Sequence, residues 1–92
     1  MTLGEIAAAT GAELRGDAGR VVTRVQTLAE ADGQAVSFLA NPRYRRYLES
    51  TRAGAVIVGP EHAEAAPVPA LIAADPYLTY ARVAAVVRPV PV

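Results

Sequence analysis

The 92-residue sequence contains no cysteine, no lysine and no tryptophan. Without cysteine the chain has no disulfide, no thiolate nucleophile and no cysteine-ligated metal site. The nine basic residues are all arginines, and nine acidic residues balance them to a net charge of zero. Proteins that bind nucleic acids or anionic membranes in general need a basic excess. The composition therefore argues against a general binder of either kind.

Long apolar runs are also missing from the sequence. No window approaches the roughly 18 apolar residues of a membrane-spanning helix, and the N-terminus lacks the basic and apolar segments of a signal peptide. We therefore expect a cytoplasmic protein without a membrane span. Hydrophobic residues make up 52% of the chain and are mostly alanine and valine. This content is enough for one small domain with a thin stability margin.

Three segments carry the start signals of helices. Thr2 to Glu5 fits a capping box, and Gly11 is suited to a left-handed helix end. Asn41-Pro42 and Asp75-Pro76 each join a capping side chain to a proline at the first helical position. The predicted helices run from the N-terminus to Gly11, from Pro42 to about Thr51, and from Pro76 to about Val87.

Short apolar segments alternate with these helices and predict strands. In residues 21–25 the alternation places Val21 and Val25 on one face and Val22 and Arg24 on the other. The other predicted strands are Ala12 to Arg15, Val36 to Leu39, Ala70 to Ala73, and the wholly apolar Ala55 to Val58, which we expect to be covered on both faces. The alternation predicts a small single α/β domain, with a sheet of about four to five strands and flanking helices.

The segment Ser37 to Leu48, S-F-L-A-N-P-R-Y-R-R-Y-L, holds three of the five aromatic residues of the chain. A strand ending at Phe38, a cap at Asn41 and a first helical turn with Tyr44 would place two rings beside one crevice. In open α/β sheets ligands bind beyond the carboxyl ends of the strands, where this segment lies. The pattern is consistent with a site that stacks a planar ligand such as a nucleotide base.

A simpler interpretation of the same segment remains open. Tyr44, Tyr47, Leu48 and Thr51 follow the spacing of a helix face, so the tyrosines could belong to the core alone. Arg43, in the first helical turn, is the best placed of three neighbouring arginines to meet an anion such as a diphosphate.

Other candidate residues carry weaker signals. We expect His62, the one histidine, at the surface, because no nucleophile or carboxylate pattern surrounds it in the sequence. Tyr77 and Tyr80 share a helix face and are predicted to be core residues. No carboxylate pair, catalytic serine or phosphate loop is recognisable, so we expect no catalytic residues, no metal and no cofactor.

Four motifs together resemble the N-terminal domain of the UDP-3-O-acylglucosamine N-acyltransferase family of lipid A (lipopolysaccharide) biosynthesis. They are G-A-E-L-R-G-D at Gly11 to Asp17, S-F-L-A-N-P-R-Y at Ser37 to Tyr44, A-G-A-V-I-V at Ala53 to Val58, and D-P-Y-L-T-Y-A-R at Asp75 to Arg82. The resemblance spans nearly the whole chain in the family's order. The second and fourth motifs are specific in combination.

The resemblance implies a uridine-binding domain that holds the UDP-sugar substrate. Phe38 and Tyr44 would sandwich the uracil, Asn41 would contact the nucleotide, and Arg43 stands where the family often has lysine. Residues 1–88 would form this domain, and residues 89–92 would begin a linker. The family's hexapeptide-repeat β-helix is absent from this chain, and with it the catalytic histidine, the acyl carrier protein contacts and the homotrimer interface. The fragment alone would then be non-catalytic.

Two alternatives stay open at this point. One is the N-terminal UDP-binding domain of a muramoyl-peptide ligase. These ligases have a strand similar to Ala53 to Val58, but their motifs before that strand are not found in this sequence. The other is a non-catalytic interaction domain whose tyrosines are only core residues. The exposure of Phe38 and Tyr44 separates this second alternative from a binding site.

Overall fold

The sheet has five strands in the order β1-β5-β4-β3-β2 in the computed structural model, which describes residues 2–28, 30–39 and 41–87. The strands are β1 (Glu13–Arg15), β2 (Arg24–Val25), β3 (Ala35–Phe38), β4 (Ala55–Val58) and β5 (Ala70–Ile72). The helices are α1 (Leu3–Thr10), α2 (Arg45–Ser50), α3 (Pro76–Val87), and the 3₁₀-helices η1 (Pro42–Tyr44) and η2 (Pro60–Ala65). The predicted α/β fold is confirmed. Residues 89–92, where a linker was predicted, lie outside the described residues.

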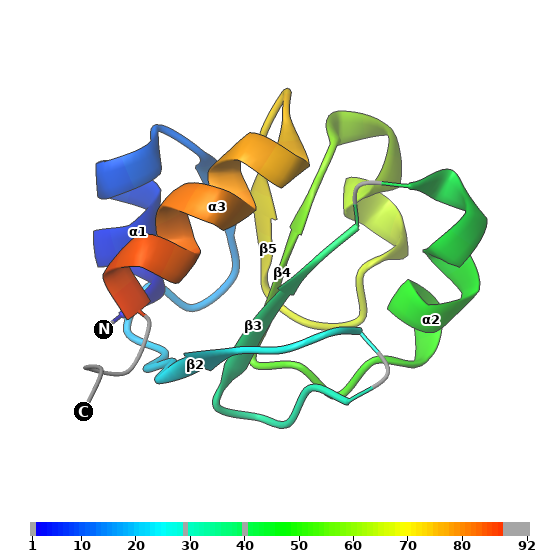
Figure 1. Ribbon diagram of the computed structural model, residues 1–92, viewed down its shortest axis with the longest axis horizontal. Helices are drawn as coiled ribbons and strands as arrows, with labels where there is room; N and C mark the ends of the chain where they lie inside the picture. The colour runs from blue at the N-terminus through cyan, green and yellow to red at the C-terminus, as the bar shows by residue number, and fades with distance from the viewer. Residues whose placement is uncertain (1, 29, 40, 88–92) are drawn as a thin grey trace.

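Helices cover both faces of the sheet. Strands β2 to β5 are parallel, and β1 joins the edge of β5 in antiparallel pairing. Figure 1 shows α1 and α3 together on one side of the sheet, with α2 on the opposite side. The crossover connections from β3 to β4 and from β4 to β5 contain α2 and η2, and both pack on the same side of the sheet. The sheet is therefore the middle layer of three.

Two apolar clusters fill the spaces between these layers. The α3-side cluster contains Leu3, Ile6, Val22, Val36, Ala55, Ile57, Leu71 and Val83. The α2-side cluster contains Leu28, Ala31, Ala35, Leu39, Leu48, Ala53, Val56, Val58, Ala63, Ala70 and Ile72. Successive residues of β4 enter the two clusters in turn, because side chains alternate across a strand. This arrangement confirms that β4 is covered on both faces.

The ends of α1 follow their sequence signals. The Thr2 hydroxyl accepts a hydrogen bond from the Glu5 amide at 3.2 Å, and the Glu5 carboxylate accepts one from the Thr2 amide at 2.8 Å. The carboxylate also accepts a hydrogen bond from the Thr2 hydroxyl at 3.1 Å, and the bonds that it accepts from the amide and the hydroxyl of Thr2 lower the pKa of the Glu5 carboxyl group. Gly11 ends the helix with φ of 75°, a left-handed conformation that favours glycine. The capping box and the helix end are both confirmed.

The segment Val21 to Val25 departs from the prediction. Only Arg24 and Val25 pair with β3, whereas Val21 forms an isolated bridge with Thr2. Val22 and Val25 both pack in or against the α3-side cluster, and Val21 is 52% exposed. The predicted assignment of faces is wrong because these five residues do not form one continuous strand with a period of two.

The helix predicted from Pro42 to Thr51 is divided. Its start is the 3₁₀-helix η1, in which the Tyr44 amide donates to the Asn41 carbonyl at 3.0 Å. The α-helical part, α2, begins at Arg45 and ends at Ser50. At the Asp75-Pro76 junction, by contrast, α3 is α-helical from its first turn, since the Thr79 amide donates to the Asp75 carbonyl at 3.1 Å. Similar starting sequences thus produce two kinds of helix.

Two side chains lie where the sequence patterns did not predict them. His62 is only 8% exposed, so its predicted surface position is wrong; the η2 segment that carries it lies against β4 and β5. Tyr77 is 65% exposed, although it was predicted to be a core residue. Its helix neighbour Tyr80 is half-buried and packs against the α3-side cluster, as predicted. Tyr77 belongs to the first turn of α3 and is not one of the side chains that pack against the α3-side cluster.

Candidate functional site

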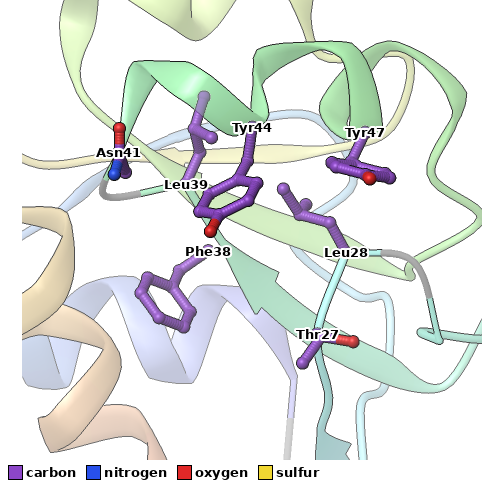
Figure 2. Close-up of a pocket in the computed structure, with 7 residues that line it drawn as sticks. All are labelled: Thr27, Leu28, Phe38, Leu39, Asn41, Tyr44 and Tyr47. Atoms are coloured by element: carbon purple, nitrogen blue, oxygen red, sulfur yellow. The ribbon is translucent and has the colours of Figure 1, made fainter.

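A pocket with a volume of about 410 Å³ opens at the carboxyl ends of β2 and β3. It is lined by residues from the end of β3, from η1 and α2, and from the segment that follows β2. The lining residues, drawn in Figure 2, are Thr27, Leu28, Phe38, Leu39, Asn41, Tyr44 and Tyr47. Three of them, Phe38, Asn41 and Tyr44, are candidate site residues from the sequence. The structure therefore brings these three together around one cavity.

Phe38 is the last residue of β3 and is held by aromatic contacts from α3. Its ring stacks on Tyr80 with centroids 3.9 Å apart and an interplanar angle of 26°. The Tyr77 ring meets it edge-on, with centroids 6.1 Å apart and an angle of 74°. One face of the Phe38 ring is thus occupied by Tyr80. A planar ligand would have to use the opposite face or the edge of this ring.

Tyr44 reaches the pocket from the other helical layer. It ends η1 and is 46% exposed, so the sequence stripe that would make it a core residue does not describe its position. Figure 2 shows its ring extending from η1 toward Phe38. The Tyr47 ring lies beside it, with centroids 6.0 Å apart. Tyr47 packs against the α2-side cluster, as predicted, and also lines the pocket.

Asn41 lies at the start of η1 on the margin of the pocket. Its side-chain Oδ1 accepts a hydrogen bond from the Arg43 amide at 3.0 Å. The bond confirms that Asn41 caps the helix, because an N-terminal helical amide has no partner within the helix itself. It also fixes the orientation of the side-chain amide.

The arginines near the pocket all lie outside its lining. Arg43, Arg45 and Arg46 are exposed. The Arg46 guanidinium lies over the Tyr47 ring at 5.1 Å from the centroid, and its Nη2 donates to the Tyr47 hydroxyl at 3.3 Å. Arg43, the predicted anion-binding residue, contributes its backbone amide to the Asn41 cap. Its side chain is exposed at the surface.

Thr27 and Leu28 form the wall of the pocket that follows β2. The Leu28 carbonyl accepts a hydrogen bond from the buried Thr51 hydroxyl at 2.9 Å, which ties this wall to the end of α2. The Thr27 carbonyl accepts from the amides of Glu30 and Ala31 at 3.2 and 2.9 Å. The wall is therefore held by backbone hydrogen bonds as well as by packing.

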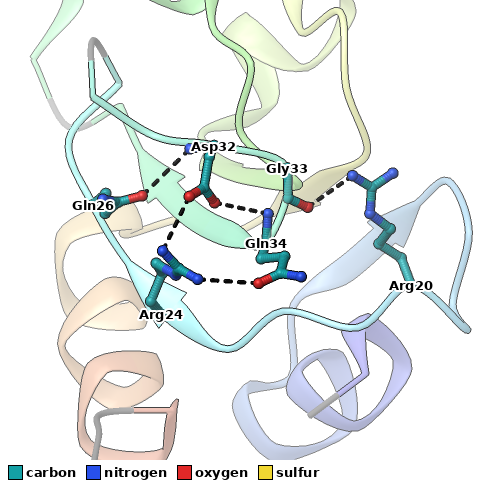
Figure 3. Close-up of polar contacts among 6 residues, drawn as sticks. All are labelled: Arg20, Arg24, Gln26, Asp32, Gly33 and Gln34. Carbon is teal, nitrogen blue, oxygen red and sulfur yellow. Dashed lines mark hydrogen bonds and ion pairs between the residues drawn. The ribbon is translucent and has the colours of Figure 1, made fainter.

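A network of polar contacts secures the rest of this segment (Figure 3). Arg24 of β2 pairs with Asp32 at 3.1 Å and donates to Gln34 Oε1 at 3.0 Å. Asp32 Oδ1 accepts from the Gln34 amide at 2.9 Å, and the Asp32 amide donates to Gln26 Oε1 at 3.3 Å. Arg20 reaches the Gly33 carbonyl at 2.8 Å. These contacts hold both ends of the connection that carries Thr27 and Leu28.

The lining chemistry suits binding by stacking and hydrogen bonds. Among the seven lining residues there is no carboxylate, imidazole or guanidinium. The polar side chains are one amide, one threonine hydroxyl and two phenols, and the remaining residues are leucines and a phenylalanine. Aromatic rings bind planar groups through their faces, and a fixed amide can read a polar edge.

Most of the chain matches a known protein family. A family model described as UDP-3-O-(3-hydroxymyristoyl) glucosamine N-acyltransferase matches residues 20–86. The chain belongs to this N-acyltransferase family. The match favours the family over the muramoyl-peptide ligase alternative.

Curated relatives from three bacteria carry the name UDP-3-O-acylglucosamine N-acyltransferase. The chain is 49% identical over 85 residues to the protein of Alcanivorax borkumensis. This alignment covers 92% of this chain and 25% of the relative. It is 48% identical over 91 residues to the protein of Pseudomonas entomophila and 45% identical over 91 residues to that of Pseudomonas putida. Each of these two alignments covers 99% of this chain and 26% of the relative. The chain thus spans about a quarter of the length of the N-acyltransferases it matches.

Four of the seven residues that line the pocket were not predicted as site residues from the sequence. Leu39 and Tyr47 lie within the aromatic segment, whereas Thr27 and Leu28 precede its first residue, Ser37, by ten and nine positions. Thr27 comes shortly after the end of β2, just as Asn41 comes shortly after the end of β3. Only the pairing of β2 beside β3 reveals that these two strand ends meet.

Two buried polar atoms lie outside the pocket lining. The Ser37 hydroxyl and His62 Nδ1 have no hydrogen-bond partner among the described residues. His62 Nε2 is 3.8 Å from the exposed Glu61 carboxylate. Within the described residues no three histidine, aspartate or glutamate side chains gather as metal ligands, and no helix has the length and apolar character to cross a bilayer.

Proposed function

We propose that this domain binds the uridine end of UDP-3-O-(3-hydroxyacyl)glucosamine for an N-acyltransferase of lipid A biosynthesis. The observation that carries the proposal is the placement of Phe38 and Tyr44 around one pocket with Asn41 at its margin. A base stacked on an aromatic side chain gains about 1 to 3 kcal/mol per contact. The volume of about 410 Å³ is in the range of small-molecule sites.

The two rings come from different layers, which suits a sandwich. Phe38 is held from the α3 side, and Tyr44 belongs to the layer of α2. A uracil between them would meet the Phe38 face that Tyr80 leaves open, and the Asn41 amide would meet a polar edge of the base. Arg43 is exposed immediately after the cap, so its guanidinium can meet the diphosphate outside the pocket.

In the full-length protein this binding would position the substrate. Relatives about four times as long are named N-acyltransferases, and the family name specifies a glucosamine that is acylated on nitrogen. The uracil is remote from that nitrogen, so binding energy at the pocket would orient the sugar and would take no part in bond formation. We propose that acyl transfer from acyl carrier protein, homotrimer formation and the catalytic residues belong to the remainder of a cytoplasmic enzyme.

Tyr44→Ala tests the stacking site most cleanly because the ring is half exposed and contributes little to the core. We expect UDP affinity, measured by calorimetry, to fall roughly 5- to 150-fold, which corresponds to the loss of one stacking contact. Leu78→Ala is the matched control, since Leu78 is 48% exposed and lies outside the pocket lining. An unchanged UDP affinity in Tyr44→Ala, with the fold intact by circular dichroism, would refute the assignment.

Phe38→Ala is the second variant for the same site. We expect it to weaken UDP binding as well, but also to lower stability, because the ring packs on Tyr80 and on the α3-side cluster. The expected loss of stability is moderate, because Phe38 is only partly buried. UDP binding to Phe38→Ala should therefore be measured well below the unfolding temperature of this variant.

A further inference from the structure

The Phe38 ring can turn only about its own side-chain torsions, because the sheet fixes its backbone. Phe38 pairs with Ile57 of β4, and the amide of the following residue, Leu39, donates to the Ile57 carbonyl at 2.9 Å. The plane of the ring is therefore determined by the side chains that pack against it. This plane matters for a stacked ligand, since a side chain that must be ordered during binding lowers the affinity.

Two tyrosines of α3 hold the Phe38 ring. Tyr80 stacks on it with centroids 3.9 Å apart, and Tyr77 meets it at an interplanar angle of 74° with centroids 6.1 Å apart. The stacked contact resists tilting of the ring, and the nearly perpendicular contact resists sliding of the ring across Tyr80. Residues three apart on a helix lie on the same face, so both tyrosines reach Phe38 from one rigid element.

These contacts leave the pocket side of Phe38 open. Phe38 lines the pocket, whereas Tyr77 and Tyr80 do not. The ring surface that α3 covers is thus different from the surface that faces the cavity. Figure 2 shows the Tyr44 ring extending toward Phe38 from η1. A planar ligand would therefore enter a row of rings, with Phe38 and Tyr80 in succession on one side and Tyr44 on the other.

The position of Tyr77 is not explained by core packing. Tyr77 is 65% exposed and does not pack against the α3-side cluster. Among the described residues, Phe38 is the one aromatic partner of its ring. The helical turn that carries it is held by Asp75, whose Oδ1 accepts from the Leu78 amide at 3.1 Å. A role in orienting Phe38 accounts for a large ring at this exposed position.

We propose that Tyr77 and Tyr80 are positioning residues, which fix the plane of the Phe38 ring and so preorganise the pocket for a stacked base. The inference rests on the proposed function and adds to that site two residues of a helix outside the pocket lining. Both tyrosines act through Phe38 and have no contact with the ligand. Their rings carry the effect, and their hydroxyl groups do not.

The UDP affinity of the 92-residue chain and its variants, measured by NMR titration well below their unfolding temperatures, tests this proposal. We expect Tyr77→Ala and Tyr80→Leu each to weaken UDP binding about 3- to 10-fold, the effect of one side chain that must be ordered on binding. Tyr77→Phe and Tyr80→Phe keep the rings and should bind UDP within about twofold of the wild type. Val83→Ala is the control. Val83 is a buried residue of the same helix, so this variant should lose stability and keep its UDP affinity.

A double-mutant cycle with Phe38→Ala distinguishes positioning from a general weakening of the fold. If the tyrosines act through Phe38, adding Tyr77→Ala or Tyr80→Leu to Phe38→Ala should change the remaining UDP affinity by less than about twofold. An unchanged affinity in either single variant, an equal loss in Val83→Ala, or an undiminished loss in the Phe38→Ala background would overturn the inference and leave the stacking site in place. A wild-type chain that does not bind UDP would refute the proposed function and this inference together.

Discussion

Thr51→Val removes one buried hydroxyl that links the pocket to the fold. Thr51 directly follows α2 and is buried. Its hydroxyl donates to the Leu28 carbonyl at 2.9 Å and accepts from the Ala53 amide at 3.3 Å. Valine replaces the hydroxyl by a methyl group of similar size, so packing is retained while both hydrogen bonds are lost.

The expected loss of stability follows from these two bonds. A buried backbone group left without a partner destabilises a protein by about 1 to 3 kcal/mol. The bond to Leu28 is short and should count fully, whereas the 3.3 Å bond from Ala53 is weaker. We expect a decrease of about 2 to 3 kcal/mol in the free energy of unfolding, or roughly 10 to 20 °C in Tm for a domain of this size.

Urea unfolding followed by circular dichroism measures this change. The midpoint should fall while the slope of the transition stays constant. Thr51→Ser keeps the hydroxyl and should lose about 1 kcal/mol or less, and Thr23→Val changes an exposed threonine and should stay within about 0.5 kcal/mol of the wild type. A Thr51→Val protein as stable as the wild type would show that the two bonds do not hold the Leu28 wall.

Two further predictions concern the backbone and the pH dependence of stability. Gly54→Ala should lower the free energy of unfolding, measured by urea unfolding, by about 2 to 3 kcal/mol, because a Cβ there would lie 2.5 Å from the Gly33 carbonyl oxygen. Gly11 has open space around it, so Gly11→Ala should lower the free energy of unfolding by only about 1 kcal/mol. Equal losses in the two variants would contradict this reasoning. The Glu5 pKa is lowered by its bonds from Thr2, so the stability it contributes is present above the ordinary glutamate pKa and is lost as pH falls through the folded-state value. An NMR titration should show the lowered pKa, and Glu5→Gln should reduce the dependence of stability on pH below about pH 5; a normal pKa would rule out the capping box in solution.

Local rules predicted the elements whose signals are complete within a few residues. The capping box at Thr2, the left-handed Gly11 and the wholly apolar β4 each need only neighbouring residues, and the structure confirms them. The Asp75 cap is also confirmed, since its Oδ1 accepts from the Leu78 amide at 3.1 Å. Such features follow from sequence because their partners are close in sequence.

Elements that depend on distant partners were predicted less well. The segment Val21 to Val25 has the alternation of a strand. Val21, however, forms an isolated bridge with Thr2 near the N-terminus, and only two residues of the segment form β2. Tyr77 and His62 depend on where α3 and η2 lie over the sheet, which no local pattern specifies. Their exposure was predicted from helix faces and from the polarity of neighbouring residues, and both signals were misleading.

The candidate site shows the same division. Phe38, Asn41 and Tyr44 could be grouped from sequence because one strand, one cap and one helical turn bring them together within seven residues. The wall formed by Thr27 and Leu28 could not, because it requires the parallel pairing of β2 with β3. Whether the grouped residues bind uridine is a separate question, which the variants of Tyr44 and Phe38 address.

The position of the pocket shows how a domain with so few aromatic residues brings two rings to one edge of its sheet. The two apolar clusters lie on opposite faces of the sheet, and the layers above them can meet only beyond the ends of the strands. Phe38, fixed by Tyr80, brings one ring from the α3 side to this edge, and Tyr44 brings another from the α2 side. The distance between the rings therefore depends on how both layers pack on the sheet. Because a ligand between them would bind only the folded arrangement, UDP at one hundred times its Kd should raise the free energy of unfolding by about 2.7 kcal/mol.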